Sequence, residues 1–278
     1  MKYEQASGPV VLVTGSTDGI GLETAELLLA GGARVIVHGR KQDRIDAALA
    51  ALAKVGGDRL LPPVRGDLSS LAEVRAMGAE LAKREVPVDV LLNNAGIFQT
   101  EQRTSGDGFE LTMAVNHFAP FVLTHALLAS TPTLSRVVNV SSMAHARGRL
   151  DIADAALTKR SFEGYGAYGA SKLANILFTV ELAKRLRARK VMVNALHPGV
   201  VSTKLLTEGF GMSGNDTLEE ASRTSVHLAL SEEGGRVTGL YFSHEKQARV
   251  SGMAGDQALA RAFYEKSCEL TGTAPLPP

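Results

Sequence analysis

Apolar residues along the chain alternate between short continuous runs and longer segments in which they recur every three or four positions. The short runs predict buried strands and the longer segments predict amphipathic helices, as in a parallel sheet with helices on both faces. Right-handed crossovers then favour a doubly wound α/β fold. Seven strands are predicted at 9–14, 34–38, 59–65, 88–92, 136–141, 190–196 and 239–242, and seven helices at 20–30, 43–54, 69–84, 107–130, 167–187, 218–230 and 256–271.

Two long segments, 144–166 and 202–216, depart from this alternation. Both follow the carboxyl ends of predicted strands, where open α/β sheets bind ligands, so we expect them to be substrate loops. Three glycines in the second segment predict a lid: Gly209, Gly211 and Gly214. No internal repeat and no linker divides the chain, so residues 1–278 are expected to form a single domain that ends in a frayed tail at 274–278.

The chain of 278 residues has 30 Lys and Arg against 29 Asp and Glu, a net charge of +1. This balance argues against binding nucleic acid, which needs a large basic excess. With 45% hydrophobic and 21% charged residues, the composition is that of a soluble globular protein. The most apolar stretch, 118–128, is interrupted by Thr124 and His125, so no membrane span is expected, and with no signal peptide recognisable the expected location is cytoplasmic.

Metal and disulfide chemistry find no support in the sequence. Cys268 is the only cysteine, which excludes an intramolecular disulfide and a multi-cysteine metal site. Asp151 and Asp154 are interpreted as loop residues and not as a ligand cluster. Three histidines near the predicted ligand edge, His117, His145 and His197, are interpreted as structural.

Glycine is unusually frequent. It accounts for 28 of the 278 residues, about a tenth of the chain, against an average near 7% in proteins. Three of them lie where the first strand meets the first helix, in the run Thr14-Gly15-Ser16-Thr17-Asp18-Gly19-Ile20-Gly21. A turn of this kind lets the backbone approach a pyrophosphate and directs the helix N–H groups toward its charge. The turn therefore predicts a dinucleotide site.

The second strand leads into Gly39, Arg40 and Lys41, with Arg44 close behind. A carboxylate at this point would bind the ribose 2′-hydroxyl of NAD, whereas arginine binds a 2′-phosphate. Because the acid is missing and the arginine is present, NADP(H) is favoured over NAD(H). The alternative is that Arg40 and Lys41 are solvated residues that open the next helix.

Tyr168 and Lys172 lie four residues apart on a predicted helix, and therefore on one face of it. A nearby ammonium favours phenolate, so we expect Lys172 to lower the pKa of Tyr168 and to make it an acid-base group. Tyr165 is a weaker candidate, because Gly169 stands four residues after it.

Taken together, these motifs resemble the short-chain dehydrogenase/reductase family. The match comprises the T-G-x-x-x-G-x-G turn, Asp67-Leu68, Asn93-Asn94-Ala95-Gly96, Tyr-x-x-x-Lys, and Pro198-Gly199-Val200-Val201-Ser202-Thr203, in family order. The resemblance implies a Rossmann-type fold and hydride transfer between a nicotinamide and a substrate carbon. The cofactor-binding residues it implies are Gly15, Ser16, Thr17, Asp18, Gly19, Ile20, Gly21, Arg40, Asp67, Leu68, Asn94, Ala95, Gly96, Tyr168, Lys172, Pro198, Gly199, Val201 and Thr203.

The resemblance also assigns catalytic roles to Asn116, Ser142, Tyr168 and Lys172. Tyr168 would exchange a proton with the substrate oxygen and Ser142 would polarise it. Lys172 would assist Tyr168 and bind the nicotinamide ribose, and Asn116 would hold a water that connects Lys172 to solvent. Ser141 would be structural, Asn93 would border the adenosine, and Thr203 and the backbone of Val200 would orient the nicotinamide amide.

Within the family the resemblance is to the retinol-dehydrogenase-like branch, carried by Ser141–His145, Ser171–Asn175 and His197–Val201. It implies an apolar aldehyde, ketone or alcohol as substrate, and a homodimer or homotetramer assembled through helices near 118–128 and 173–186. The expected pocket side chains are Ile97, Phe98, Met143, Phe162, Leu205, Leu206, Phe210 and Met212. The alternative function is a catalytically silent nucleotide sensor or scaffold on the same fold.

Overall fold

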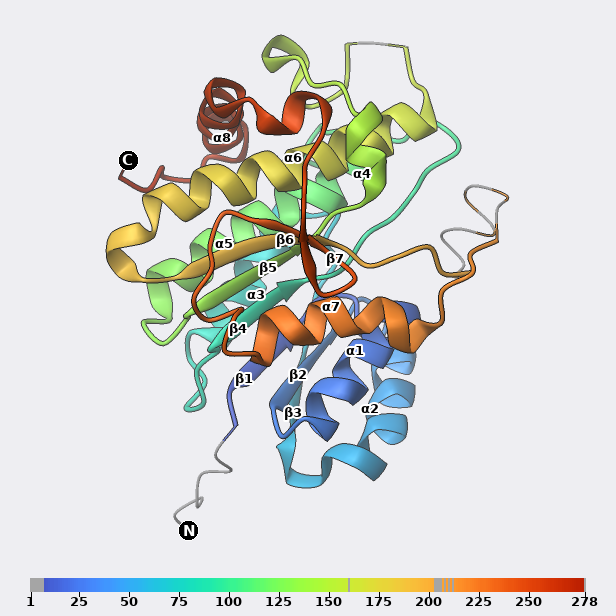
Figure 1. Cartoon of the computed structure of the whole chain (residues 1–278), viewed down its shortest axis with the longest axis vertical. Helices are drawn as coiled ribbons and strands as arrows, with labels where there is room; N and C mark the ends of the chain where they lie inside the picture. Colours follow the sequence, from blue (N-terminus) through green and yellow to red (C-terminus); the bar gives the residue numbers. More distant parts are fainter. Residues whose placement is uncertain are drawn as a thin grey trace.

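One mixed sheet lies at the centre of the molecule (Figure 1). The computed structural model describes residues 8–159, 161–202, 207, 209, 211 and 213–277, and within them the strand order is β3-β2-β1-β4-β5-β6-β7-β8. All neighbouring strands are parallel except β7 and β8. The strands are β1 Val10–Val13, β2 Arg34–Gly39, β3 Leu60–Arg65, β4 Val90–Asn93, β5 Arg136–Val140, β6 Met192–His197, β7 Tyr241–Ser243 and β8 Lys246–Ala248.

All seven predicted strands are present, so the prediction of a doubly wound parallel sheet is confirmed. The structure adds β8, a short antiparallel strand at the sheet edge. It follows a two-residue turn in which His244 and Glu245 both have positive φ, at 50° and 58°. That turn geometry is usually built from Asn-Gly or Asp-Gly, so the sequence here carries no hairpin signal.

Helices cover both faces of the sheet, as predicted (Figure 1). Alternate side chains of β1 point to opposite faces of the sheet. Val11 and Val13 belong to the hydrophobic core beneath α1, α2 and α7. Val10 and Leu12 belong to the core beneath α3, α5, α6 and α8. The helices are α1 Gly19–Ala30, α2 Gln42–Gly56, α3 Leu71–Leu81, α4 Leu111–Met113, α5 Ala119–Ser130, α6 Gly164–Arg185, α7 Leu218–Leu230 and α8 Gln257–Thr271.

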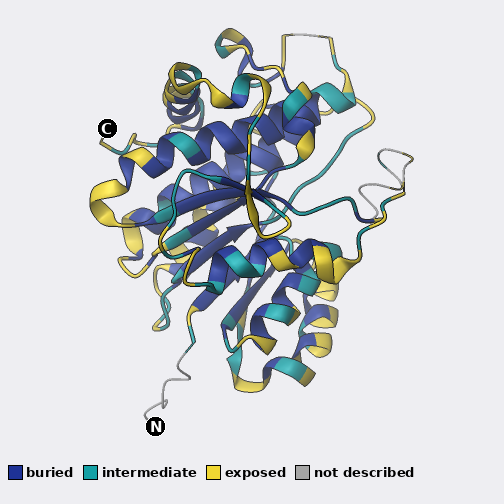
Figure 2. Cartoon of the chain, viewed as in Figure 1, coloured by how far each residue is buried: buried dark blue, intermediate teal, exposed yellow. Residues whose placement is uncertain are grey.

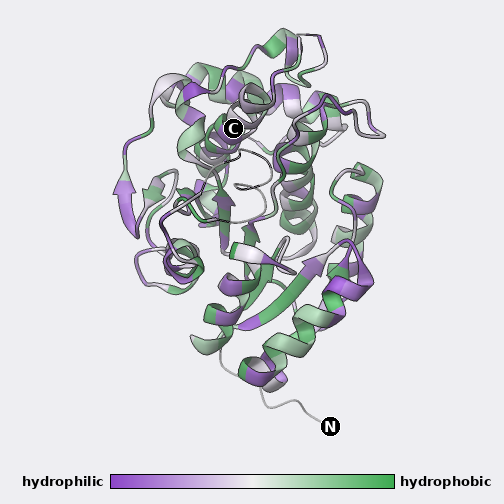
Figure 3. Ribbon diagram, turned by 90° about the vertical axis from the view of Figure 1, so that its right-hand side faces the viewer, coloured by the Kyte–Doolittle hydropathy of each residue, from purple (hydrophilic) through white to green (hydrophobic). Residues whose placement is uncertain are grey.

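Figure 2 shows buried residues along the strands and along the inward faces of the helices. In the hydropathy view, single helices carry both hydrophilic and hydrophobic residues (Figure 3). This distribution agrees with the amphipathic spacing from which the helices were predicted.

The predicted helix at 107–130 is shorter and less regular than its sequence pattern indicates. It begins at Leu111, because the Glu110 side chain accepts hydrogen bonds from the N–H groups of Thr112 and Met113 and so caps the helix. A π-helical segment, Ala114–Phe118, then joins α4 to α5. By length and composition Leu111–Ser130 could cross a membrane, but 89% of its most apolar window is buried inside the protein, as in a core helix.

Helix α8 lies across α6 (Figure 1) and is joined to the α5 side by buried polar contacts. His117 Nε2 lies 3.1 Å from Ser267 Oγ, and His125 Nε2 lies 2.8 Å from Tyr264 Oη. The histidine rings also contact the aromatic rings of Phe263 and Tyr264. The structural interpretation of His117 is therefore confirmed.

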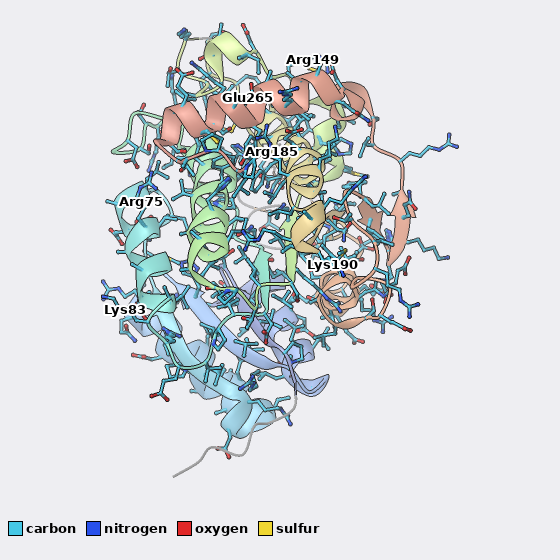
Figure 4. The ribbon with its side chains drawn as sticks, turned by 90° about the vertical axis from the view of Figure 1, so that its left-hand side faces the viewer. Arg75, Lys83, Arg149, Arg185, Lys190 and Glu265 are labelled. Atoms are coloured by element: carbon cyan, nitrogen blue, oxygen red, sulfur yellow. The ribbon has the colours of Figure 1, made fainter. Side chains whose placement is uncertain are left out.

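The C-terminal tail is held against this helix layer, so the expectation that it is frayed is wrong for Leu276. Its N–H donates to Tyr264 Oη at 3.0 Å, and its carbonyl accepts from Arg185 at 2.6 Å. Arg185 is almost fully buried, and its guanidinium also contacts Glu181 at 2.7 Å and Glu265 at 3.6 Å. Figure 4 shows Arg185 on α6 with Glu265 above it on α8.

Candidate active site

A cleft of about 940 Å³ opens at the carboxyl ends of the parallel strands. It lies where the strand order reverses, with β2 on one side of β1 and β4 on the other, which is where doubly wound sheets bind ligands. All but two of the predicted cofactor residues line it. The exceptions are Ser16, which is fully buried, and Thr203, which lies outside the described residues.

The glycine turn that lines the cleft leaves no room for a side chain at Gly15 or at Gly21. Gly15 has φ +66°, and a Cβ there would lie 2.9 Å from Ala95 Cα. A Cβ on Gly21 would lie 2.2 Å from the Gly15 carbonyl oxygen. Asp18 caps the first turn of α1 by accepting the Gly19 N–H at 2.9 Å. The turn therefore presents bare backbone at a helix N-terminus, a fit for a pyrophosphate.

Residues after β4 hold this turn from the other side. Thr14 Oγ1 accepts the N–H groups of Asn94 and Ala95 at 3.0 and 3.1 Å, and the Asn94 amide donates to the Thr14 carbonyl at 2.8 Å. Asn93 points away from the cleft, where its amide donates to Asn139 and Thr124. The expectation that Asn93 borders the adenosine is therefore wrong, because alternate residues of a strand face opposite sides of the sheet.

His38, at the end of β2, is a cleft residue that the sequence reasoning missed. Its Nδ1 accepts the Gly15 N–H at 3.0 Å, and its Nε2 donates to the Gly66 carbonyl at 3.2 Å. Burial lowers its pKa to about 4, so the ring is neutral and fits these two partners. Ser16 Oγ accepts the His38 N–H and donates to the Val13 carbonyl, so Ser16 joins the glycine turn to β1 and β2. A histidine directly before Gly39, at the ligand edge of a strand, is the signal that could have found it.

Gly39 and Arg40, at and directly after the end of β2, line the cleft as well. A Cβ on Gly39 would lie 2.6 Å from Thr17 Cγ2 and 2.9 Å from Ile45 Cγ1, so this position is crowded as well as uncharged. Arg40 lines the cleft and contacts Asp67 Oδ2 at 3.3 Å. Burial alone would raise the pKa of Asp67, but hydrogen bonds from Ser69 and the charge of Arg40 outweigh it and lower that pKa.

Ser142, Tyr168 and Lys172 meet on one wall of the cleft. Ser142 directly follows β5, and Tyr168 lies in the first turns of α6, which Glu163 caps by accepting the Tyr165 N–H at 3.0 Å. This cap starts α6 at Gly164, three residues before the predicted start. Tyr168 hydrogen-bonds the Ser142 side chain.

The protonation states of this group differ from the prediction. Burial raises the pKa of Tyr168 to about 12, although the hydrogen bond with Ser142 acts in the opposite direction. Burial also lowers the pKa of Lys172 to about 8. The ammonium lies 5.5 Å from the Tyr168 ring centre and donates to the Val140 carbonyl at 3.1 Å. The expected lowering of the Tyr168 pKa is therefore wrong for the chain alone, because removal of the phenolate from water outweighs the distant charge.

Asn116 lies behind the cleft wall, in the π-helical segment. Its amide accepts the Ile97 N–H at 2.8 Å and donates to the Ile97 carbonyl at 3.0 Å. It also donates to Ser171 Oγ at 3.0 Å. Asn116 thus fixes the loop after β4 to the start of α6, and its role as a water holder stays a prediction. Ser141 donates to the Lys172 carbonyl at 2.7 Å, in line with its structural interpretation.

The loop after β6 also borders the cleft, which Pro198, Gly199 and Val201 line. The Val200 N–H donates to Asp216 at 2.6 Å, so it is already bonded within the chain. His197 lines the cleft too, and burial lowers its pKa to about 4. Four predicted pocket residues, with much of the predicted lid, lie outside the described residues: Leu205, Leu206, Phe210 and Met212.

The remaining predicted pocket residues divide into two groups. Ile97 and Met143 line the cleft. Phe98 meets Tyr168 edge-on with ring centres 6.0 Å apart, and Phe162 packs against the core. Among the described residues, no group of three His, Cys, Asp or Glu side chains could hold a metal ion.

Comparison with known proteins gives a consistent result. Residues 9–212 match the family described as short chain dehydrogenase. Human retinol dehydrogenase 13 is 37% identical over 286 residues, covering 95% of this chain and 85% of that protein. A crystal structure of an uncharacterized protein from Mycobacterium paratuberculosis has a TM-score of 0.81 at 32% identity, covering 98% of this chain and 96% of that one. A blue fluorescent protein from a metagenomic library, in complex with NADPH, has a TM-score of 0.68 at 28% identity, covering 86% and 97%.

Proposed function

Because the chain belongs to the short-chain dehydrogenase family, and is thereby an NAD(P)-dependent oxidoreductase acting on CH–OH groups, we propose that it is specific for NADP(H) and apolar substrates. It reduces apolar aldehydes or ketones, or oxidises the corresponding alcohols. The observation that carries the proposal is the meeting of Ser142, Tyr168 and Lys172 on one wall of a cleft whose floor is the glycine turn. A silent sensor on this fold would not need that group.

Each residue has a definite task in the proposed reaction. NADP(H), when bound, supplies or accepts the hydride. During reduction the Tyr168 hydroxyl donates its proton to the substrate oxygen, for which its raised pKa keeps it protonated at neutral pH. The Ser142 hydroxyl donates a hydrogen bond to the same oxygen. Lys172 supplies a buried positive charge beside them.

The preference for NADP(H) is supported by Gly39 and Arg40. Gly39 offers no acid to repel a 2′-phosphate, and its surroundings would resist any side chain. Arg40 lines the cleft with an exposed guanidinium that can bind phosphate with two N–H groups. The complex of the 28%-identical fluorescent protein with NADPH is consistent with this assignment.

The preference for an apolar substrate is supported by two exposed side chains. Among the described residues, the large hydrophobic side chains that stand exposed are Met143 at 59% and Leu218 at 37%, and both line the cleft. Exposed apolar surface gathered at an opening is typical of a binding site. The match to human retinol dehydrogenase 13 points to the same substrate class. We further propose that the protein is cytoplasmic.

A screen of NADPH oxidation over apolar aldehydes and ketones tests this function. Turnover is expected in the wild type and is expected to fall by about 10²- to 10⁴-fold in Tyr168→Phe, which removes the proton donor but keeps the ring. Tyr165→Phe is the matched control, because Tyr165 lines the same cleft and should keep most of the activity. Tight NADPH binding without turnover across a broad panel would instead favour the silent sensor.

A further inference from the structure

His145 connects the catalytic serine to a distant part of the chain. It belongs to the 3-10 helix Met143–Arg147 that Ser142 caps, and its side chain is 3% exposed. Its Nδ1 lies 2.7 Å from the Ser142 carbonyl oxygen and its Nε2 lies 3.3 Å from the Ser251 backbone nitrogen. A carbonyl only accepts and a backbone N–H only donates. The ring is therefore the neutral Nδ1–H tautomer, with both nitrogens in use.

The segment on the other side of His145 is closely packed. Gly252 has φ +61°, and a Cβ there would lie 3.1 Å from the Ala146 carbonyl oxygen. The ring itself meets Tyr241 of β7 edge-on, with centres 5.1 Å apart. The imidazole is thus held in its plane by the sheet on one side and by the chain after β8 on the other.

Three hydrogen bonds fix the turn that begins at Ser142. Ser142 Oγ accepts the Ala144 N–H at 3.2 Å, and the Ser142 carbonyl accepts both the backbone N–H of His145 at 3.1 Å and the bond from the His145 ring at 2.7 Å. A hydroxyl that accepts one hydrogen bond becomes a better donor for another. The bond to Oγ restrains the χ1 rotation of Ser142, and the bonds to its carbonyl restrain the backbone that carries this side chain, so the direction of Oγ is set before a substrate arrives.

We propose that His145 is a positioning residue that orients Ser142 toward the substrate through the bond from its Nδ1–H to the Ser142 carbonyl. The inference rests on the proposed role of Ser142. His145 does not touch the reacting atoms and exchanges no proton in the reaction. Its effect is expected in kcat, because misplacement of a catalytic group by about 1 Å can cost roughly a hundredfold in rate.

Two variants separate the two bonds of the ring. His145→Asn places an amide nitrogen near the position of Nδ1, and His145→Gln places one near Nε2. We expect His145→Asn to keep kcat within about threefold, and His145→Gln to lower it by about ten- to a hundredfold with KM and the NADPH dissociation constant unchanged. Equal kcat values in the two variants, or a loss of NADPH affinity or melting temperature that parallels the loss of kcat, would overturn the proposal.

A second measurement does not depend on turnover. The ¹⁵N chemical shifts of the His145 ring in the wild-type protein should report a protonated Nδ1 and an unprotonated Nε2 at neutral pH. An Nε2–H tautomer would overturn the positioning role even in an active enzyme. If the tautomer is as expected and no substrate turns over, the proposed function fails and the geometry around Ser142 stands.

Discussion

The ammonium of Lys172 and the ring centre of Tyr168 lie 5.5 Å apart, and burial moves their pKa values away from each other, that of Lys172 down to about 8 and that of Tyr168 up to about 12. Both shifts favour the uncharged form. In the chain alone, Tyr168 is therefore a neutral phenol at neutral pH, beside a Lys172 ammonium that loses its proton near pH 8. The neutral phenol is the form that donates a proton during reduction.

The rate of carbonyl reduction should consequently fall at alkaline pH. The Tyr168 phenol stays protonated up to about pH 12, but Lys172 loses its charge as the pH rises through about 8. We expect kcat/KM for reduction to be flat on the acid side of this value and to decrease above it, which a profile from about pH 6 to pH 10 would measure. A profile that rises with pH would contradict this assignment.

Removal of Arg40 should reduce the preference for NADPH over NADH. Arg40→Ala removes the expected phosphate ligand and leaves the Asp67 carboxylate, now without its partner at 3.3 Å, to repel a 2′-phosphate. We expect the ratio of NADPH to NADH affinity to fall by at least about tenfold, equivalent to about 1.4 kcal/mol. Arg236→Ala removes an exposed arginine elsewhere and serves as the control. An unchanged ratio in Arg40→Ala would remove Arg40 from this role.

Gly39 allows crowding and charge to be tested separately. Gly39→Ala introduces the Cβ that meets Thr17 and Ile45, so it should weaken both cofactors to a similar extent. Gly39→Asp adds a carboxylate to the same Cβ and should in addition weaken NADPH relative to NADH. Dissociation constants of both cofactors for both variants decide this, and equal ratios in Ala and Asp would argue that the 2′ position lies elsewhere.

Acid should destabilise the fold before its carboxylates are protonated. Burial lowers the pKa of His38, His125 and His197 to about 4 and that of His117 to about 3, against an ordinary value of 6.5. The unfolded chain therefore binds more protons between about pH 6.5 and pH 4. Stability is present above this window and is lost as the pH falls through it, by on the order of 2 kcal/mol per histidine at pH 5. Urea unfolding at pH 7 and pH 5 should differ accordingly, and equal midpoints would contradict the prediction.

Assembly can be tested by sedimentation. The resemblance implied a homodimer or homotetramer through residues 118–128 and 173–186. In the structure these segments are largely buried within one chain, and α8 lies across α6. Because their apolar faces are already covered, we expect the purified protein to sediment as a monomer. A stable dimer would show that another surface mediates assembly.

Regular features of the fold could be predicted from the sequence because they depend on local patterns. The seven parallel strands follow from apolar runs, and the glycine turn follows from its place between a strand and a helix. β8 could not be predicted, since its turn uses non-glycine residues at positive φ.

The sequence predicts which residues form the site better than it predicts their pKa values. Ser142, Tyr168 and Lys172 do share a wall of the cleft, but the Tyr168 pKa depends on burial by segments far away in sequence. The orientation of Asn93 and the contact of His38 with Gly15 depend on packing between strands, which no local pattern encodes.

The contacts of α8 also bear on the order of events at the ribosome. His117 and His125 are made about midway through synthesis, but their partners Ser267 and Tyr264 lie 150 and 139 residues further on. Until α8 has been synthesised, the apolar residues of α5 and α6 that pack against it have no partner in the nascent chain. Premature termination before Phe263 should therefore yield an aggregation-prone product that contains every predicted catalytic residue.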